Sequence, residues 1–88
     1  MSLSEADPVM EKAYQLVREE FIRAYQRHGD FNSLHEGYAV LLEESDELWD
    51  IIKHKRPDLD EVINEATQVA AMGIKMLVFT LRNKAKKS

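Results

Sequence analysis

The fold class follows from residues 33–54, which read SLHEGYAVLLEESDELWDIIKH. Apolar side chains return every three or four positions in this stretch, which is the spacing of one face of an α-helix. Ser33 and Glu36 open it with a capping box, in which the serine caps the Glu36 amide and the glutamate reaches back to the Ser33 amide. The segment therefore predicts a helix over about 33–54.

A second helix is predicted before this one. Asp7 can cap its N-terminus, and Pro8 then occupies the first helical position, where the missing N–H costs nothing. Gly29 can end the helix because glycine accepts the left-handed backbone conformation of a residue just past a helix. The sequence therefore predicts a helix over about 7–28.

A third helix is predicted after the break at Pro57. Asp58 and Glu61 repeat the pattern of a cap followed by an acid, and a periodic apolar stretch continues to about residue 83. No window in the chain alternates with the period of two that a half-buried strand requires. We therefore expect an all-α fold with a third helix over about 58–83, and a single domain over residues 1–88.

Chain length and composition together predict self-association. A domain of 88 residues buries only about 60 % of its unfolded surface. Yet 44 % of the residues are hydrophobic, which is more apolar surface than three short helices readily hide. The predicted core stripes are Leu34, Gly37, Tyr38, Leu41, Ser45, Leu48 and Ile52 on the second helix, and Leu59, Val62, Ile63, Ala66, Val69, Ala70, Gly73, Leu77 and Leu81 on the third. We expect a three-helix protomer that forms a helical bundle, such as a four-helix bundle, as a homodimer or homotetramer.

Composition also excludes several classes of protein. The absence of cysteine excludes disulfides and thiolate metal sites. A net charge of −4 argues against a partner that is a nucleic-acid polymer, because such binding usually needs a basic face. No unbroken apolar run approaches the roughly 20 residues of a membrane span, and residues 1–5 lack the pattern of a signal peptide. We expect a soluble, cytoplasmic protein that does not bind membranes.

Two flanks of the predicted helices interleave acids with large apolar residues. They comprise Val40, Glu44, Glu47 and Ile51 on the second helix, and Glu61, Glu65, Gln68, Met72 and Phe79 on the third. If the flanks face each other, ionised carboxylates at about 4 Å repel by about 4 kcal/mol per pair at a dielectric near 20. Oxygen ligands without cysteine or paired histidines favour a hard cation such as Mg²⁺. Alternatively, the acids border a solvated groove.

These acids carry a resemblance to a family. The chain resembles the MazG-like all-α nucleoside triphosphate pyrophosphatases, which are marked by E-x-x-E on one helix and E-x-x-D on the next. Glu44 and Glu47 match the first motif, Glu65 begins the second, and the similarity covers most of residues 14–82. Gln68 departs from the pattern because it stands at the family's aspartate. The amide oxygen can still meet a metal, but one formal charge is lost, and we expect weaker Mg²⁺ binding.

The resemblance implies hydrolysis of a nucleoside triphosphate to the monophosphate and pyrophosphate, which removes surplus or damaged nucleotides. The implied catalytic residues are Glu44 and Glu47, and the implied metal ligands are Glu44, Glu47, Glu65 and Gln68. Which glutamate is the base stays open. The alternative hypothesis is a non-catalytic helical oligomerisation module in which Gln68 marks a degenerate metal site.

Four further residues are candidates for contact with the substrate. They are Lys53, Lys55, Trp49 and Glu61. Lys53 and Lys55 can reach phosphates from the end of the second helix, although complementing the helix dipole explains them equally well. Trp49 can stack on a base or pack in the core. Glu61 can replace a ligand one turn before Glu65. Lys75 projects away from the predicted stripe and is interpreted as a surface residue unless oligomerisation covers it.

Overall fold

The computed structural model describes residues 7–87. In this range it contains three α-helices and no strand: α1 (Pro8–His28), α2 (Leu34–Ile52) and α3 (Leu59–Lys87). The all-α prediction is confirmed. The chain has three helices over this range and not four, so a four-helix bundle would require a second copy. Residues 1–5, which lack the pattern of a signal peptide, lie outside the described residues.

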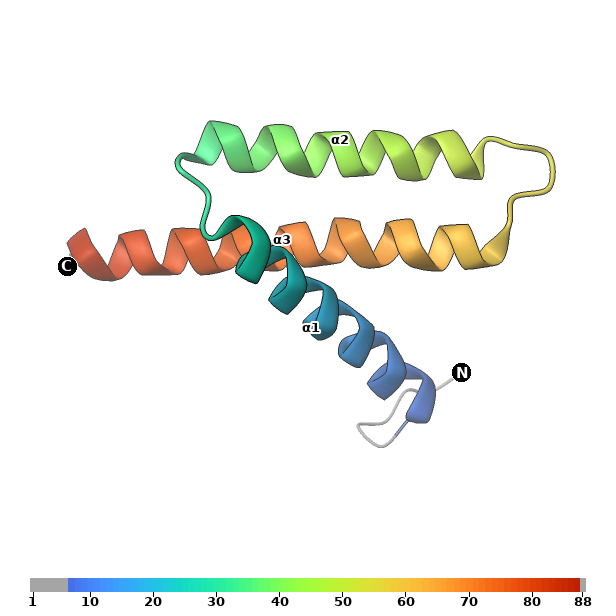
Figure 1. Cartoon of the computed structure of the whole chain (residues 1–88), viewed down its shortest axis with the longest axis horizontal. Coiled ribbons are helices and arrows are strands. Elements are labelled where there is room, and N and C mark those ends of the chain that lie inside the picture. Colours follow the sequence, from blue (N-terminus) through green and yellow to red (C-terminus); the bar gives the residue numbers. More distant parts are fainter. Residues whose placement is uncertain (1–6, 88) are drawn as a thin grey trace.

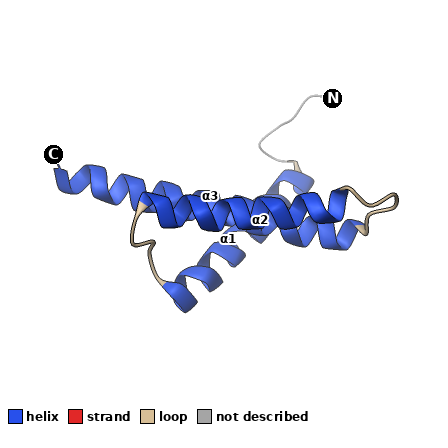
Figure 2. Ribbon diagram, turned by 90° about the horizontal axis from the view of Figure 1, so that it is seen from above, coloured by secondary structure: helices blue, strands red, loops and turns tan. Residues whose placement is uncertain are grey.

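The third helix is the centre of the arrangement. α2 and α3 lie side by side and run antiparallel, as the short link between them predicts, whereas α1 crosses α3 obliquely and extends away from the pair (Figures 1 and 2). α1 and α2 each contact α3 but do not contact each other. The radius of gyration is 14.9 Å, against about 12 Å for a compact chain of this length. The protomer is therefore open and elongated.

The boundaries of α1 are set by the residues that the sequence indicated. The Asp7 carboxylate accepts hydrogen bonds from the amides of Val9 (2.8 Å) and Met10 (3.3 Å). Gly29 ends α1 as predicted, and its amide donates to the Tyr25 carbonyl at 2.7 Å. Its φ of 70° with a ψ of −158° lies outside the expected left-handed helical region, in a conformation that few residues other than glycine adopt. Both cap residues are therefore confirmed, but the expected conformation of Gly29 is not.

Only one of the two hydrogen bonds of the predicted capping box forms at the start of α2. Ser33 Oγ accepts from the Glu36 amide at 3.0 Å, as predicted. The Glu36 carboxylate does not return to the Ser33 amide but accepts from Asn32, through its backbone N–H at 3.2 Å and its side-chain Nδ2 at 3.0 Å. Asn32 offers two donors where Ser33 offers one, and these hydrogen bonds lower the pKa of Glu36.

Two other helix ends differ from prediction. α2 ends at Ile52, two residues earlier than expected. α3 begins at Leu59, with Asp58 accepting from the Asp60 amide at 2.9 Å, and continues to Lys87, four residues further than expected. The last turn contains no glycine or proline, and its lysines stabilise the negative end of the helix dipole.

The core of the protomer is small. Phe31, Ala71 and Met72 are its buried apolar residues. Partly buried side chains from all three helices pack against them: Val17, Phe21, Ala24, Val40, Leu41, Met76 and Phe79. The core therefore lies where the loop between α1 and α2 closes over the middle of α3.

The predicted core stripe of α3 is largely wrong for the single chain. Ile63, Leu77 and Leu81 are more than half exposed, and Ala66 and Ala70 are exposed as well. Instead, the neighbouring face of α3, which carries Met72 and Phe79, packs against α1 and α2. The reason is that α1 and α2 both pack on that face, which hydrophobic periodicity alone does not reveal.

The predicted stripe of α2 is divided between interior and surface. Gly37 is buried, and Leu41 and Leu48 are half-buried, but Leu34, Tyr38 and Ile52 are exposed. A Cβ atom on Gly37 would lie 2.7 Å from Met76 Cε and 2.9 Å from the Phe31 ring. Glycine therefore allows α2 to approach the core closely at this point.

The interpretation of Lys75 as a surface residue is wrong, because only 4 % of the residue is exposed within the single chain. Its Nζ lies 4.5 Å from the centre of the Phe31 ring. Phe31 precedes α2 and closes over this face of α3, so tertiary packing covers a side chain that the helical pattern alone placed outside.

α3 is long and apolar enough to cross a membrane, judged by length and composition. An 18-residue window has a mean hydropathy of 1.2 and is 17 % buried. This differs from the expectation based on unbroken apolar runs, because the window averages over polar residues such as Lys75. The core helix of a soluble protein meets the same criterion, so the predictions on membranes and localisation stay predictions.

Candidate functional site

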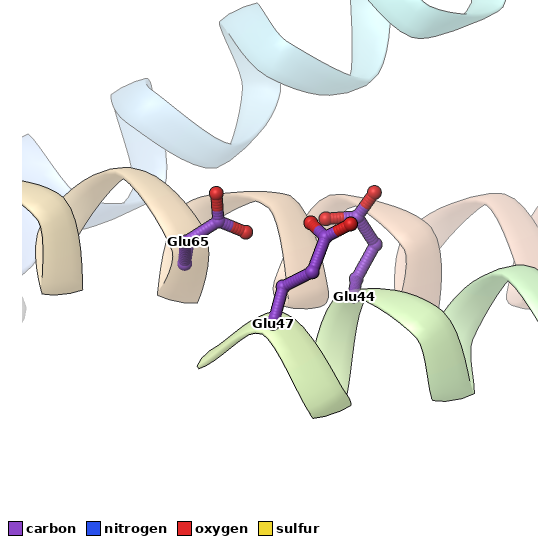
Figure 3. Close-up of side chains that lie close together, drawn as sticks. All are labelled: Glu44, Glu47 and Glu65. Atoms are coloured by element: carbon purple, nitrogen blue, oxygen red, sulfur yellow. The ribbon is translucent and has the colours of Figure 1, made fainter. Parts of the chain in front are cut away.

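Three glutamates from two helices converge beside the core. Glu44 and Glu47 come from α2 and Glu65 from α3, and one carboxylate oxygen of each lies within 4.8 Å of the others. Figure 3 shows the side chains of Glu44 and Glu47 extending from α2 toward α3, where the carboxyl group of Glu65 lies. We call this group the acidic cluster.

Helix geometry accounts for the convergence. Glu44 and Glu47 are three residues apart, so their side chains lie on the same face of α2. α3 runs antiparallel beside this face and places Glu65 opposite the pair (Figure 3). The convergence expected from the two flanks is therefore present, and it depends on the α2–α3 contact.

Burial and repulsion from neighbouring carboxylates raise the pKa values of Glu44 and Glu65. Desolvation first, and then the charges of Glu47 and Glu65, raise the pKa of Glu44 to about 7. Desolvation and the charge of Glu47 also raise the pKa of Glu65. The Oε2 atoms of Glu44 and Glu65 are buried without a hydrogen-bond partner. No basic residue among those described forms an ion pair with these carboxylates.

The acidic cluster fits a hard divalent cation. A cation between the three carboxylates would neutralise their repulsion and occupy the two buried oxygens that have no partner. The donors are all carboxylate oxygens, which suits Mg²⁺, an ion that commonly keeps several waters and shares its shell with substrate phosphates. Mg²⁺ bound here would leave positions open to a ligand.

Gln68 and Glu61 lie near the acidic cluster but outside the group of three. Gln68 is half-buried. Together with Glu44 it lines a cavity between the helices, which is described below. Glu61 is exposed, and its charge contributes to raising the pKa of Glu65, which places it on the same side of α3. Both therefore stay close enough to support a site at the acidic cluster.

The remaining predicted substrate contacts are not brought to the cavity. Trp49 is 60 % exposed and does not line the cavity beside Glu44. Lys53 forms an ion pair with Asp50 at 2.9 Å, and Lys55 is exposed in the turn before α3. On α2, Trp49 lies about 140° around the helix axis from Glu44. In a single chain these residues are remote from the cavity.

A cavity of about 620 Å³ adjoins the acidic cluster, and sequence reasoning missed it. We call it the interhelical cavity. Its lining includes Glu44 and Gln68 together with three cationic residues, Arg23, Arg27 and Lys75. One signal was visible: Arg23 and Arg27 are four residues apart and so share a face of α1.

Comparisons of the chain with protein-family models, with curated proteins and with solved structures found no match in any of the three. The resemblance to the MazG-like pyrophosphatases therefore stays a prediction that rests on the acids quoted from the sequence.

Proposed function

We propose that the chain is a Mg²⁺-dependent nucleoside triphosphate pyrophosphohydrolase of the MazG-like type. The observation that carries the proposal is the acidic cluster, in which Glu44, Glu47 and Glu65 meet from two helices with two buried oxygens unpartnered. Such an arrangement destabilises the chain unless a cation or protons occupy it. The adjoining interhelical cavity supplies room for a ligand.

The reaction is the hydrolysis of one phosphoanhydride bond. A water oxygen bonds to the α-phosphorus, the bond to the bridging oxygen between the α- and β-phosphates breaks, and pyrophosphate leaves with the electron pair. Bound Mg²⁺ would supply charge neutralisation of the phosphates. Glu44, Glu47 and Glu65, with the Gln68 amide oxygen as a weaker fourth ligand, would hold the ion.

Glu44 is the best candidate for the base that takes the water proton. Of the three glutamates, it is the one that lines the interhelical cavity. A carboxylate at this position, beside the bound ion, can accept the proton of a water that attacks a ligand in the cavity. The water would give its proton to a Glu44 oxygen and attack as hydroxide.

The test measures Mg²⁺-dependent release of pyrophosphate from a panel of ribo- and deoxyribonucleoside triphosphates. Glu44→Gln and Glu47→Gln are compared with the native chain, and Asp46→Asn serves as the control because Asp46 is exposed and outside the acidic cluster. We expect both glutamine variants to lose turnover, and Glu47→Gln also to lose stabilisation by Mg²⁺. No turnover by the folded native protein with any nucleotide would refute the proposal.

We also propose that the working form is a homodimer or homotetramer. The chain exposes 7030 Å², whereas a compact monomer of 10.2 kDa exposes about 5300 Å². The excess, about 1700 Å² per chain, is within the range that stable homodimers bury on each partner.

The exposed apolar stripe of α3 is the proposed contact. Ile63, Leu77 and Leu81 are more than half exposed, and small residues lie between them along the same face. A Cβ atom on Gly73 would meet nothing within 4 Å, so a helix from a second copy can approach here. Packing of this kind would complete a helical bundle and hide the stripe that the sequence assigned to the core.

One observation favours the alternative, a non-catalytic oligomerisation module. Gln68 provides an amide where a fourth carboxylate would strengthen the metal site, while the exposed apolar stripe is intact. A folded oligomer without Mg²⁺ binding would support the module. A Mg²⁺-induced rise in the melting temperature that depends on Glu47 would support the enzyme.

A further inference from the structure

The side chain of Lys75 is buried along its length, and the residue lines the interhelical cavity. Only 4 % of the residue is exposed, and its Nζ makes no ion pair or hydrogen bond to any residue in the range 7–87. Its contact with the Phe31 ring, 4.5 Å away, attracts the charge but satisfies none of its three N–H donors. The ammonium group is not among the buried atoms that lack a partner, so its N–H donors are open to an anion in the cavity.

Three other acids line the interhelical cavity, and none of them forms an ion pair with Lys75. Glu36 accepts two hydrogen bonds from Asn32, and the charge of Lys75 also helps to lower its pKa. Asp30 accepts from Arg82 at 2.7 Å through Oδ2, while its Oδ1 is buried without a partner, and Glu20 pairs with Arg23 at 3.0 Å. No carboxylate is therefore close enough to occupy the ammonium group of Lys75.

The cavity joins this cation to the acidic cluster. Glu44 and Gln68 line it together with Lys75, and Arg27 and His28 line it from the end of α1. Arg27 forms no ion pair with any described residue. The lining of one cavity thus combines a carboxylate that belongs to a candidate metal site with two cations that form no ion pair with a described residue.

We propose that the interhelical cavity binds the β- and γ-phosphates of the substrate, with Lys75 as their main cationic contact and Arg27 as a second. The inference rests on the proposed function for its substrate, and it assigns the direction in which the triphosphate lies. The α-phosphate is next to the acidic cluster, and the leaving pyrophosphate is held against α1. Inorganic pyrophosphate is recognised by the same contacts.

The test is calorimetric titration of the native protein with inorganic pyrophosphate, first in EDTA and then with Mg²⁺. Lys75→Met keeps the length and packing of the side chain and removes the charge, Lys75→Arg keeps the charge, and Lys84→Met is the control from an exposed position of the same helix. We expect Lys75→Met to weaken binding by at least about tenfold, and Lys75→Arg and Lys84→Met to keep it.

Thermal unfolding separates a binding role from a structural one. Because Lys75 forms no ion pair with any described residue and methionine keeps the apolar packing of its stem, Lys75→Met is expected to melt close to the temperature of the native chain. If Lys75→Met does not fold, the side-chain NMR signals of Lys75 in the native protein decide: they shift on addition of pyrophosphate if the proposal holds, and unchanged signals overturn it.

The outcomes distinguish this inference from the proposed function. Binding of pyrophosphate that depends on Lys75, without hydrolysis of any nucleotide, keeps the phosphate site and refutes the enzyme. Hydrolysis that depends on Glu47, with pyrophosphate binding unchanged in Lys75→Met, keeps the enzyme and overturns the phosphate site. Nucleoside triphosphate analogues that resist hydrolysis show whether the site prefers the nucleotide over free pyrophosphate.

Discussion

Replacing Glu44 by glutamine should stabilise the metal-free protein at alkaline pH. Glu44 has a buried Oε2 atom without a hydrogen-bond partner and faces two other carboxylates. Glutamine has nearly the same shape and carries no charge, so it removes both the desolvation of an ion and the repulsion from Glu47 and Glu65. The native residue is therefore expected to lower stability when no metal is bound.

The pH at which the effect develops follows from the pKa of Glu44. The pKa rises from an ordinary value of 4.5 to about 7 on folding, so between these values the folded chain holds more protons than the unfolded one. Stability of the native protein must then fall as pH increases from about 4.5 through about 7. Below that range Glu44 is protonated in both states, and the variant has no such advantage.

The size of the effect is reduced by solvent. The full shift corresponds to about 3 kcal/mol, but Glu44 is only partly buried, and after screening we expect about 1–2 kcal/mol. For a domain of this size, 1 kcal/mol changes the melting temperature by about 4–8 °C. Glu44→Gln should therefore melt roughly 4–16 °C above the native chain at pH 8, and close to it at pH 5.

The assay is thermal unfolding followed by circular dichroism at pH 5 and pH 8 in EDTA. Protein concentration is held constant because association shifts the melting temperature. Asp46→Asn is the control, since it also removes one charge from α2 but at an exposed position outside the acidic cluster. An equal pH dependence in Glu44→Gln and the native chain, or a less stable variant at pH 8, would show that the acidic cluster is not under electrostatic stress.

Three further predictions address the core, the interface and the metal site. Gly37→Ala should destabilise the chain by about 1–2 kcal/mol in urea unfolding, because its Cβ would meet Met76 and the Phe31 ring at under 3 Å; equal or greater stability would contradict that close approach. Leu77→Glu should reduce the mass measured by light scattering to that of a single chain, since Leu77 is 57 % exposed in the protomer; an unchanged mass would exclude this face as the contact. Gln68→Asp should tighten Mg²⁺ binding measured by calorimetry, because it adds a carboxylate to the cavity lining that position 68 shares with Glu44; unaltered affinity would separate position 68 from the metal site.

Local chemistry determined the helices of this protein. The caps at Asp7 and Ser33, the positive φ of Gly29 and the break at Pro57 act over a few residues, so the sequence alone placed the helix starts within one residue and the ends within four. The acidic flanks were also readable, because residues three apart on a helix share a face. Glu44, Glu47 and Glu65 could therefore be named before their distances were known.

Tertiary structure decided which faces those helices use. The periodic apolar stripe that contains Leu77 predicts a buried surface. It does not show whether the same chain or another copy covers that surface, and in the structure a different face of α3 packs against α1 and α2. Lys75 is buried because the residues before α2 close over it, a contact between segments 44 positions apart in the chain. Periodicity records the faces of one helix, whereas burial depends on how several helices pack, and the interhelical cavity exists only in that packing.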